Sequence, residues 1–272
     1  MEYKSEEEFL KAYNPNEYKK LSMTTDILLF SVSNVSQVNY RKTDEKAMSV
    51  LLVKRETYPF KDKWCVPGGF LNIDEELENC PKRILKEETN LQDIYLEQLY
   101  TFGEVDRDPR MRIVSTAYMA LIDKNNLKDT LSQNAKWFNL DYVEKNNLVT
   151  LTLSIPDKEI IIKAKRVLID STSGQYKYEI LENNDIAFDH AKVILTGLER
   201  LRNKIEYTDI VFNMMPKLFT LGELQKVYEV ILGKSLLMPA FRRIIANKVE
   251  KTDQIQGGEG HRPSYLFKYK KK

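Results

Sequence analysis

A window of 23 residues, from Gly69 to Leu91, constrains this chain more than any other feature of its sequence. Its charged and apolar residues stand at fixed intervals: Gly69, Glu75, Arg83, Leu85, Glu87, Glu88 and Leu91. On a helix, positions 84, 87 and 88 share one face, because residues three and four apart are neighbours. Carboxylates on such a face supply the oxygen ligands that hard divalent cations prefer. The window therefore predicts a helix with an acidic face, at Glu87 and Glu88, that is suited to a hard cation.

These residues resemble the Nudix box, G-x5-E-x7-R-E-U-x-E-E-x-G-U with U an aliphatic residue, and seven of its nine fixed positions match. The resemblance implies an α+β chain whose Nudix part is an α/β/α sandwich with a mixed sheet. It also implies roles for single residues. The expected metal ligands are Glu87, Glu88 and the turn carbonyl near Gly69, the expected catalytic groups of an active enzyme are Glu88, Glu87 and Arg83, and the expected ligand-binding residues include Arg55 and Gly69.

The box departs from the family at two positions, Ile84 in place of Glu and Asn90 in place of Gly. Asn90 is a mild change, because Asn tolerates the left-handed backbone that a helix end needs. Ile84 is a serious one, because the first carboxylate of the metal face is missing. Losing a positioned acid–base group costs about 10²–10⁴-fold in rate. We expect a weakened Mg²⁺ site, and the open question is whether it hydrolyses its ligand or only senses it.

The charged turn Asp106-Arg107-Asp108-Pro109-Arg110 deepens the resemblance. It is similar to the Nudix branch that handles ADP-ribose and related sugar nucleotides, together with the regulatory relatives of that branch. The resemblance implies that Arg107 or Arg110 clamps a phosphate, because a guanidinium matches the geometry of phosphate oxygens. A proline turn whose charges pair with one another is the alternative.

Short apolar segments bounded by polar residues predict strands over 24–32, 48–53, 94–102 and 113–122. A helix over 76–88 contains Pro81, so it either begins late, with Asn79 as its cap, or bends. Trp137-Phe138 resembles a strand end, and residues 149–183 predict a β insertion of two or three strands.

The C-terminal third changes to helical patterns. Apolar residues at the helical period predict a linking helix over 189–205, with His190 at its start expected to act as a cap. Three helical segments follow, over 209–215, 220–232 and 239–248, and the second opens with the capping box Thr220 and Glu223. A glycine turn at 257–260 then precedes an alternating strand. This order is the pattern of a winged helix-turn-helix, and it closely resembles the Nudix-related transcriptional regulators of the NrtR type.

We divide the chain into an N-terminal arm (1–23), a Nudix domain (24–186) that contains the β insertion at about 149–183, a linker helix (187–205) and a winged helix-turn-helix domain (206–272). The last 33 residues carry a net charge of +6, whereas the whole chain carries only +2. A basic end on an otherwise acidic chain suggests a polyanion partner. The expected DNA-binding residues are Arg242 and Arg243 for base edges, Lys248, Arg262 and Lys268 for phosphates, and His261 beside Arg262 at the wing tip.

Composition narrows the class of protein. The hydrophobic content of 42% and the 28 aromatic residues are those of a globular chain rather than a disordered one. Two cysteines cannot form a disulfide framework, and no apolar segment approaches the roughly 20 residues of a membrane span. The acidic N-terminus lacks the apolar core of a signal peptide, so we expect a cytoplasmic protein with no membrane association.

The leading hypothesis is a ligand-responsive DNA-binding regulator with a degenerate Nudix sensor, which the resemblance implies to be a homodimer on double-stranded DNA. The main alternative is an active Mg²⁺-dependent hydrolase of ADP-ribose or another nucleoside diphosphate derivative, and a third keeps both functions. The ligand stays open between ADP-ribose, another NAD-related metabolite, and a sugar or sugar phosphate.

Overall fold

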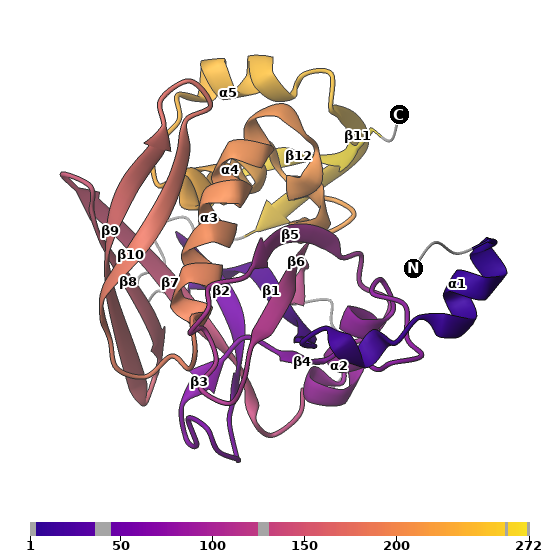
Figure 1. The fold of residues 1–272 in the computed structure, drawn as a ribbon. Coiled ribbons are helices and arrows are strands. Elements are labelled where there is room, and N and C mark those ends of the chain that lie inside the picture. Colours follow the sequence, from indigo (N-terminus) through magenta and orange to yellow (C-terminus); the bar gives the residue numbers. More distant parts are fainter. Residues whose placement is uncertain (1–3, 36–44, 125–130, 259–260, 271–272) are drawn as a thin grey trace.

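The computed structural model describes residues 4–35, 45–124, 131–258 and 261–270. A ten-stranded sheet occupies its centre, in the order β10-β9-β8-β7-β2-β1-β6-β5, with β3 attached to β2 and β4 to β1 (Figure 1). β1 (Ser22–Val35) and β6 (Ile113–Leu121) run parallel and the other pairs antiparallel, so the sheet is mixed. The remaining strands are β2 (Glu45–Lys54), β3 (Trp64–Cys65), β4 (Gly68–Phe70), β5 (Glu97–Phe102), β7 (Ala135–Lys145), β8 (Leu148–Ile155), β9 (Lys158–Asp170) and β10 (Gln175–Asn183).

Alternation along β1 sends side chains to two separate cores. Ile27 and Leu29 pack on the face covered by α2 (Cys80–Thr89), whereas Leu28 and Phe30 pack on the face covered by α3 (His190–Tyr207). Successive strand residues point to opposite faces, so a strand with both faces covered is apolar throughout. The expected α/β/α sandwich with a mixed sheet is confirmed.

Residues 149–183, expected as a β insertion of two or three strands, form three strands that continue this sheet. β8, β9 and β10 add to β7 by antiparallel pairing, and β10 becomes one edge of the sheet. β7 is an 11-residue strand, where the sequence indicated only a strand end at Trp137-Phe138. In its second half only Leu140 and Tyr142 are partly buried, and Asp141, Glu144 and Lys145 are exposed charges, so the apolar pattern that marks a strand weakens early.

The Nudix-box helix begins late. Asn79 precedes its first residue, and Pro81 lies in the first turn, where its missing N–H costs no hydrogen bond. Asn90 ends the helix in the left-handed conformation, with φ 63°, and its N–H donates to the Lys86 carbonyl oxygen. Of the two possibilities that Pro81 left open, the late start is the observed one.

The C-terminal segment folds as η3 (Ile210–Met214), α4 (Leu221–Leu232), α5 (Met238–Ile245), β11 (Val249–Gly258) and β12 (His261–Tyr269). The Thr220–Glu223 capping box is present. The segment expected as a helix over 209–215 is a five-residue 3-10 helix. Apolar residues of α4 and α5 join the core beneath α3, so one continuous core spans both halves of the chain.

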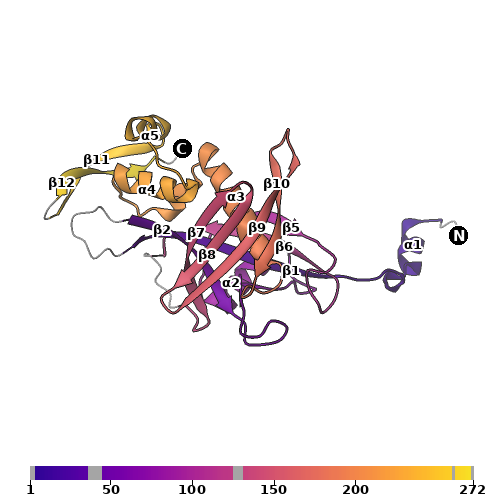
Figure 2. The same cartoon turned by 90° about the vertical axis from the view of Figure 1, so that its left-hand side faces the viewer.

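The N-terminal segment stands apart from this core. α1 (Glu6–Ala12) and the short η1 (Pro15–Glu17) contain no buried residue. Both views show α1 projecting from the body, beyond the start of β1 (Figures 1 and 2). Among the described helices, none is long and apolar enough to cross a membrane.

Candidate ligand site and nucleic-acid interface

Arg83 ties the start of α2 to the glycine turn before it. Its Nε and Nη2 donate to the two carboxylate oxygens of Glu75, both at 2.8 Å, and Nη2 also donates to the Phe70 carbonyl oxygen at 2.9 Å. Nη1 donates to Glu87 at 3.0 Å. The hydrogen bond from Arg83 lowers the pKa of Glu75 to about 2. Arg83 therefore positions the acidic residues of the box.

Position 84, where the family carries its first glutamate, belongs to the apolar core. Ile84 is 2% exposed and packs with Ile27, Leu29 and Leu85. Gly69 lies directly against it, because a Cβ added at Gly69 would stand 3.1 Å from Ile84 Cδ1. A methyl group thus fills the space between the helix and the glycine turn.

The two carboxylates that remain on the metal face of the box helix, Glu87 and Glu88, do not form a complete cation site. Glu87 is exposed and bound to Arg83. Partial burial of Glu88 and the negative charge of Glu87 raise the pKa of Glu88, and the positive charge of Arg55 opposes this rise. Across the described ranges, no three His, Cys, Asp or Glu side chains gather closely enough to hold a metal ion. The residues present do not fit the three-carboxylate magnesium site that the family implies.

Two arginines converge on one aromatic ring beside the box helix. The Arg55 guanidinium carbon lies 4.8 Å from the centroid of Phe188, and that of Arg110 lies 5.7 Å from the same centroid. Arg110 also lies 5.2 Å from the Phe70 ring, and Phe60 packs edge-on against Phe188 with centroids 4.8 Å apart. Phe60 and Phe70 are exposed. We call Arg55, Phe60, Phe70, Arg110 and Phe188 the arginine–aromatic cluster.

Arg110 differs from Arg107 in what surrounds it. Arg110 binds Asp108 through Nε at 3.0 Å and Nη2 at 2.8 Å, and its side chain is 40% exposed. Arg107 is 4% exposed and lies between two buried carboxylates, with Nη2 at 3.0 Å from Asp26 and 2.7 Å from Asp189. Of the two arginines that the turn offered as phosphate clamps, only Arg110 faces solvent, and Arg107 is committed to the interior.

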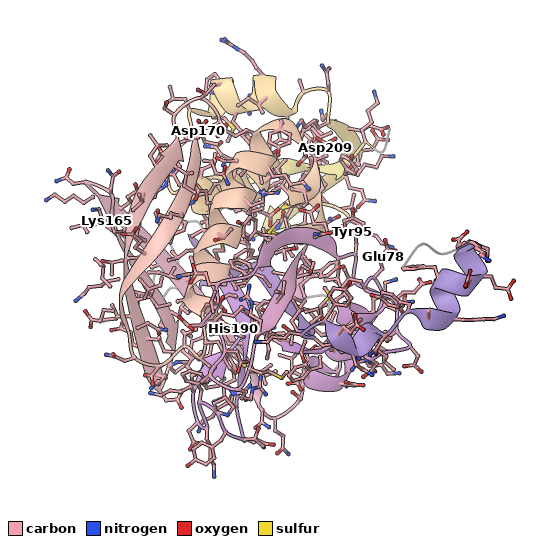
Figure 3. The ribbon with its side chains drawn as sticks, viewed as in Figure 1. Glu78, Tyr95, Lys165, Asp170, His190 and Asp209 are labelled. Atoms are coloured by element: carbon pink, nitrogen blue, oxygen red, sulfur yellow. The ribbon has the colours of Figure 1, made fainter. Side chains whose placement is uncertain are left out.

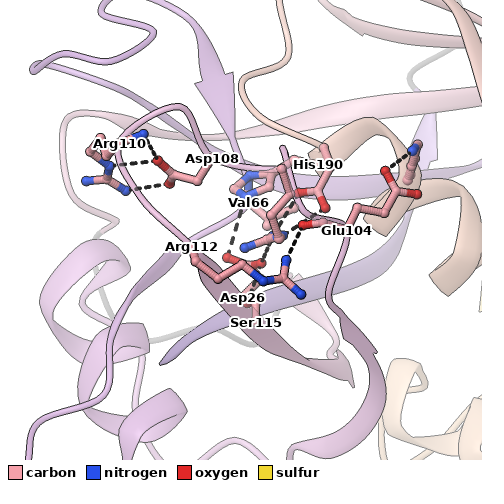
Figure 4. A network of polar contacts seen from close by, with 11 residues as sticks. Asp26, Val66, Glu104, Asp108, Arg110, Arg112, Ser115 and His190 are labelled. Atoms are coloured by element: carbon pink, nitrogen blue, oxygen red, sulfur yellow. Dashed lines mark hydrogen bonds and ion pairs between the residues drawn. The ribbon is translucent and has the colours of Figure 1, made fainter. Parts of the chain in front are cut away.

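The buried network around Arg107 joins four segments of the chain. Asp26 on β1 accepts hydrogen bonds from Arg107 and, at 2.6 Å, from Ser115 Oγ on β6, while Asp189 precedes α3 (Figure 4). Burial opposes ionisation of Asp26, but its contacts with His190, Arg107 and Ser115 favour the carboxylate and lower its pKa below the ordinary value of 3.8. The network fixes the start of α3 against the sheet and the 104–112 loop.

His190 belongs to this network and is not the helix cap that the sequence suggested. His190 lies at the start of α3 (Figure 3) and its ring is buried, with Nε2 at 3.5 Å from Asp26 (Figure 4). Burial opposes a charge on His190, and Asp26 outweighs that effect to raise its pKa. The Val66 N–H donates to Nδ1 at 3.2 Å, however, so Nδ1 must be unprotonated. We assign the neutral ring with its proton on Nε2, facing Asp26.

On the winged helix domain, α5 presents two unpaired arginines. Phe241 and Ile245 bury one side of α5, with Phe241 edge-on to Tyr228 at 5.3 Å, and Arg242 and Arg243 are exposed on the other side. α5 begins at Met238, so both arginines lie in its last turn, whereas the sequence placed them near its start. Neither forms an ion pair with any residue in the described ranges.

The other expected DNA contacts are placed differently. Lys248 binds Asp209 at 2.9 Å, donates to the Thr208 carbonyl oxygen at 3.3 Å, and is only 21% exposed. Lys268 pairs with Glu250 at 3.3 Å and lines a cavity between the two halves of the chain. The side chains of His261 and Arg262 lie outside the described residues.

Sequence reasoning missed the aromatic members of the cluster and the acids that occupy Arg107. Phe70 directly follows the glycine turn, and this adjacency was a usable signal. Phe188 and Asp189 stand more than 70 residues from the arginines that they meet, so no local pattern connects them. Asp26 resembled an ordinary polar residue at the start of an apolar strand.

Comparison with known proteins agrees with this architecture. The NUDIX domain model matches residues 33–156, and the NrtR DNA-binding winged helix domain model matches residues 211–269. The ADPR responsive transcriptional repressor NtrR of Acinetobacter baylyi is 33% identical over 273 residues, covering 98% of this chain and 89% of that protein.

Two crystal structures are similar over almost the whole chain. A MutT/nudix family protein from Enterococcus faecalis has a TM-score of 0.71 at 28% identity, covering 98% of this chain and 94% of that one. Shewanella oneidensis NrtR complexed with a 27mer DNA has a TM-score of 0.62 at 29% identity, covering 91% of this chain and 93% of that one. This chain therefore belongs to the NrtR family of transcriptional regulators, in which a Nudix domain is joined to a C-terminal winged helix domain.

Proposed function

We propose that this protein binds operator DNA through its winged helix domain and responds to ADP-ribose held by its Nudix domain. The observation that carries the proposal is Ile84, which replaces the first carboxylate of the metal face with a buried apolar side chain. A Nudix site of this kind keeps a place for a nucleotide while losing a ligand for the catalytic cation. The Acinetobacter relative, a repressor described as responsive to ADPR, supports the choice of ligand.

The arginine–aromatic cluster supplies the chemistry that ADP-ribose needs. Guanidinium groups bind phosphate oxygens by charge-assisted hydrogen bonds, often in pairs. Exposed aromatic rings offer a stacking surface for a planar base. Arg55 and Arg110 would face the diphosphate, and Phe60 or Phe70 the adenine. Asp108 would have to share Arg110 with the ligand, since that carboxylate now occupies one side of the guanidinium.

The winged helix supplies the DNA contact. Arg242 and Arg243 are exposed cations on the helix that such domains insert into the major groove. Because no carboxylate among the described residues pairs with them, they are available to guanine edges and phosphates. We place the protein on operator DNA as a homodimer, with the cytoplasm as the compartment that contains its target.

A residual hydrolase is the second candidate, and Glu87 and Glu88 are the observation that favours it. Two carboxylates on one turn of α2 would bind Mg²⁺ weakly at most, with Glu88 the better candidate for a base because its pKa is raised. We expect turnover of ADP-ribose with Mg²⁺ to fall well below about 1 s⁻¹, the lower end of ordinary enzymes. Faster turnover that Glu88→Gln abolishes would favour the enzyme.

The central experiment measures binding to the DNA upstream of the protein's own and neighbouring genes, at several salt concentrations, with and without ADP-ribose. We expect tighter binding than to random duplex, and a change in affinity when ADP-ribose is added. The Arg110→Ala protein should keep its DNA affinity and lose the response to ADP-ribose. Binding no tighter than to random duplex, with and without the ligand, would refute the DNA-binding function.

A further inference from the structure

The segment 188–190 lies where the arginine–aromatic cluster, the buried charge network and α3 meet. Phe188 belongs to the cluster, and its ring also lies 5.3 Å from the ring of His190 between centroids. Asp189 binds Arg107 through both carboxylate oxygens, at 2.9 and 2.7 Å. Arg107 stands three residues before Arg110 on the same turn. A change at Arg110 therefore reaches this segment by two routes, through Phe188 and through Arg107.

Asp189 occupies the N-cap position of α3 and yet does not act as a cap. Its side chain forms no hydrogen bond with the backbone of α3, because both oxygens bind Arg107. Aspartate is a preferred N-cap residue, since its carboxylate accepts hydrogen bonds from N–H groups of the first turn, where the helix dipole is positive. Asp189 thus has two alternative partners, and capping α3 would take at least one oxygen from Arg107.

The backbone of Phe188 has a conformation that bulky residues avoid. Its φ is 53°, in the left-handed region, which costs energy for a residue other than glycine. The surrounding contacts offset this cost: the guanidinium groups of Arg55 and Arg110 lie 4.8 and 5.7 Å from the ring centroid, and Phe60 packs edge-on. A ligand that draws Arg110 away from the ring weakens the contacts that hold this conformation.

A phosphate on Arg110 would also disturb the buried charges. Arg110 is bound to Asp108, whose side chain is only 4% exposed (Figure 4). Burial opposes ionisation of Asp108, and the charges of Arg110 and also Arg107 favour its carboxylate and lower its pKa. A buried carboxylate that loses its cation is costly, so Asp108 would turn to Arg107 as the phosphate takes Arg110. Arg107 could then release Asp189.

The helix that begins at this segment extends to the winged helix domain. α3 has 18 residues and is about 27 Å long. Near its far end, Arg202 Nε donates to the Ile231 carbonyl oxygen of α4 at 2.8 Å. Leu201 and Ile205 of α3 belong to the same buried core as Leu224 of α4. A change in how α3 begins therefore alters the position of the winged helix relative to the sheet.

We propose that Asp189 is the positioning residue that couples the two sites, bound to Arg107 in the ligand-free protein and capping α3 when the diphosphate of ADP-ribose occupies Arg110. The proposal rests on the function proposed above and adds the residue that transmits the response. Both arrangements keep the carboxylate of Asp189 hydrogen-bonded. The difference in free energy between them is therefore small enough for a ligand to shift the population from one to the other.

The test uses Asp189→Asn in the full chain. Asparagine caps a helix as well as aspartate does, but it has no charge for Arg107. The quantity measured is the ratio of operator affinities with and without saturating ADP-ribose, which we expect to be at least about fivefold in the native protein. The variant without ligand should show the affinity of the native protein with ligand, and its ratio should fall towards one. Its affinity for ADP-ribose should rise by the same factor, because coupling is reciprocal.

Asp185→Asn is the matched control. It is the same substitution four residues earlier, at a carboxylate that pairs with Lys63 at 3.1 Å and Lys158 at 2.7 Å instead of Arg107. This protein should keep the native ratio. A native ratio in Asp189→Asn would overturn the proposal, and so would an equal loss of the ratio in both variants.

Hydrogen exchange of the native protein decides the question even where Asp189→Asn does not fold. We expect the amides of residues 189–193 to exchange more slowly once ADP-ribose is added, because the cap takes up N–H groups of the first turn, and those of the later turns of α3 to stay unchanged. Unchanged exchange at 189–193, in samples whose DNA affinity does respond, would refute the role of Asp189 and leave the proposed function intact. Operator affinity that does not respond to ADP-ribose in the native protein would refute both.

Discussion

Arginines in the two halves of this molecule have opposite surroundings. Arg107 of the Nudix half is 4% exposed and lies between Asp26 and Asp189, each within 3.0 Å. Arg242 and Arg243 of the winged helix half are exposed and pair with no described carboxylate. Arg110 stands between these extremes, paired with Asp108 yet partly open to solvent. The same side chain serves as internal structure in one place and as binding surface in another.

A local pattern of charged residues in the sequence therefore does not predict whether an arginine stabilises the interior or binds a ligand at the surface. A buried guanidinium between two carboxylates is hydrogen-bonded to them instead of to water. Removing it leaves two buried negative charges without a cation, which is strongly destabilising. An exposed guanidinium keeps its five donors for an incoming anion.

Replacing Arg107 should lower the free energy of unfolding more than replacing any of the exposed arginines. In Arg107→Met, Asp26 and Asp189 remain buried without their cation, so we expect a loss of about 3–5 kcal/mol in the free energy of unfolding. Urea denaturation at neutral pH measures it. Arg110→Met is the control, and a loss of at most about 1 kcal/mol is expected there because its ion pair is partly exposed. Equal losses would show that burial does not distinguish the two arginines.

Replacing Arg242 should leave stability almost unchanged and alter DNA recognition. If Arg242 or Arg243 reads a guanine, its change to Ala should remove about 1–3 kcal/mol of discrimination at one operator position. Competition between operator variants, each carrying one changed base pair, measures this loss. If both alanine variants weaken all sequences equally, the two arginines contact phosphates only.

Acid should unfold the Nudix half through Asp26. Its pKa lies below the ordinary value of 3.8, so the carboxylate stabilises the fold above pH 4, and this contribution is lost as the pH falls below that value towards the lowered pKa. Urea denaturation between pH 5 and 2 measures the loss, and an Asp26→Asn protein should show a shallower dependence. An identical slope in both proteins would place the acid sensitivity elsewhere.

Replacing Lys248 should have the smallest effect, because this lysine is already paired within the protein. Because its ammonium binds Asp209 and the Thr208 carbonyl oxygen, Lys248→Ala should leave the salt dependence of DNA binding unchanged. Arg243→Ala, if it removes a phosphate contact, should lower that slope by about 0.9. Affinities at several salt concentrations separate the two. A slope that falls equally in both variants would show that Lys248 leaves Asp209 to reach DNA.

Sequence patterns predicted much of the fold and, at the ligand site, the residues of the Nudix box. The box spacing and the apolar strands predicted a mixed sheet between helices, and Thr220, Glu223 and Gly233 marked the limits of α4, because caps and periodicity are local properties. The missing carboxylate was visible at position 84 for the same reason. Strand β7 was mostly missed, since a half-exposed strand carries little apolar alternation.

Tertiary structure alone decided which charges are free. Nothing near Arg107 in the sequence indicates that it meets Asp26 and Asp189, each about 80 residues away. Lys248 likewise resembled a DNA contact in the sequence, but the fold pairs it with Asp209. No sequence pattern marked Phe188 as a site residue, and only the fold brings Arg55 and Arg110 to its ring. Sequence determines which groups exist and their local conformation. The availability of a charge depends on burial and on partners brought together by folding, because the cost of removing an ion from water is set by everything that surrounds it.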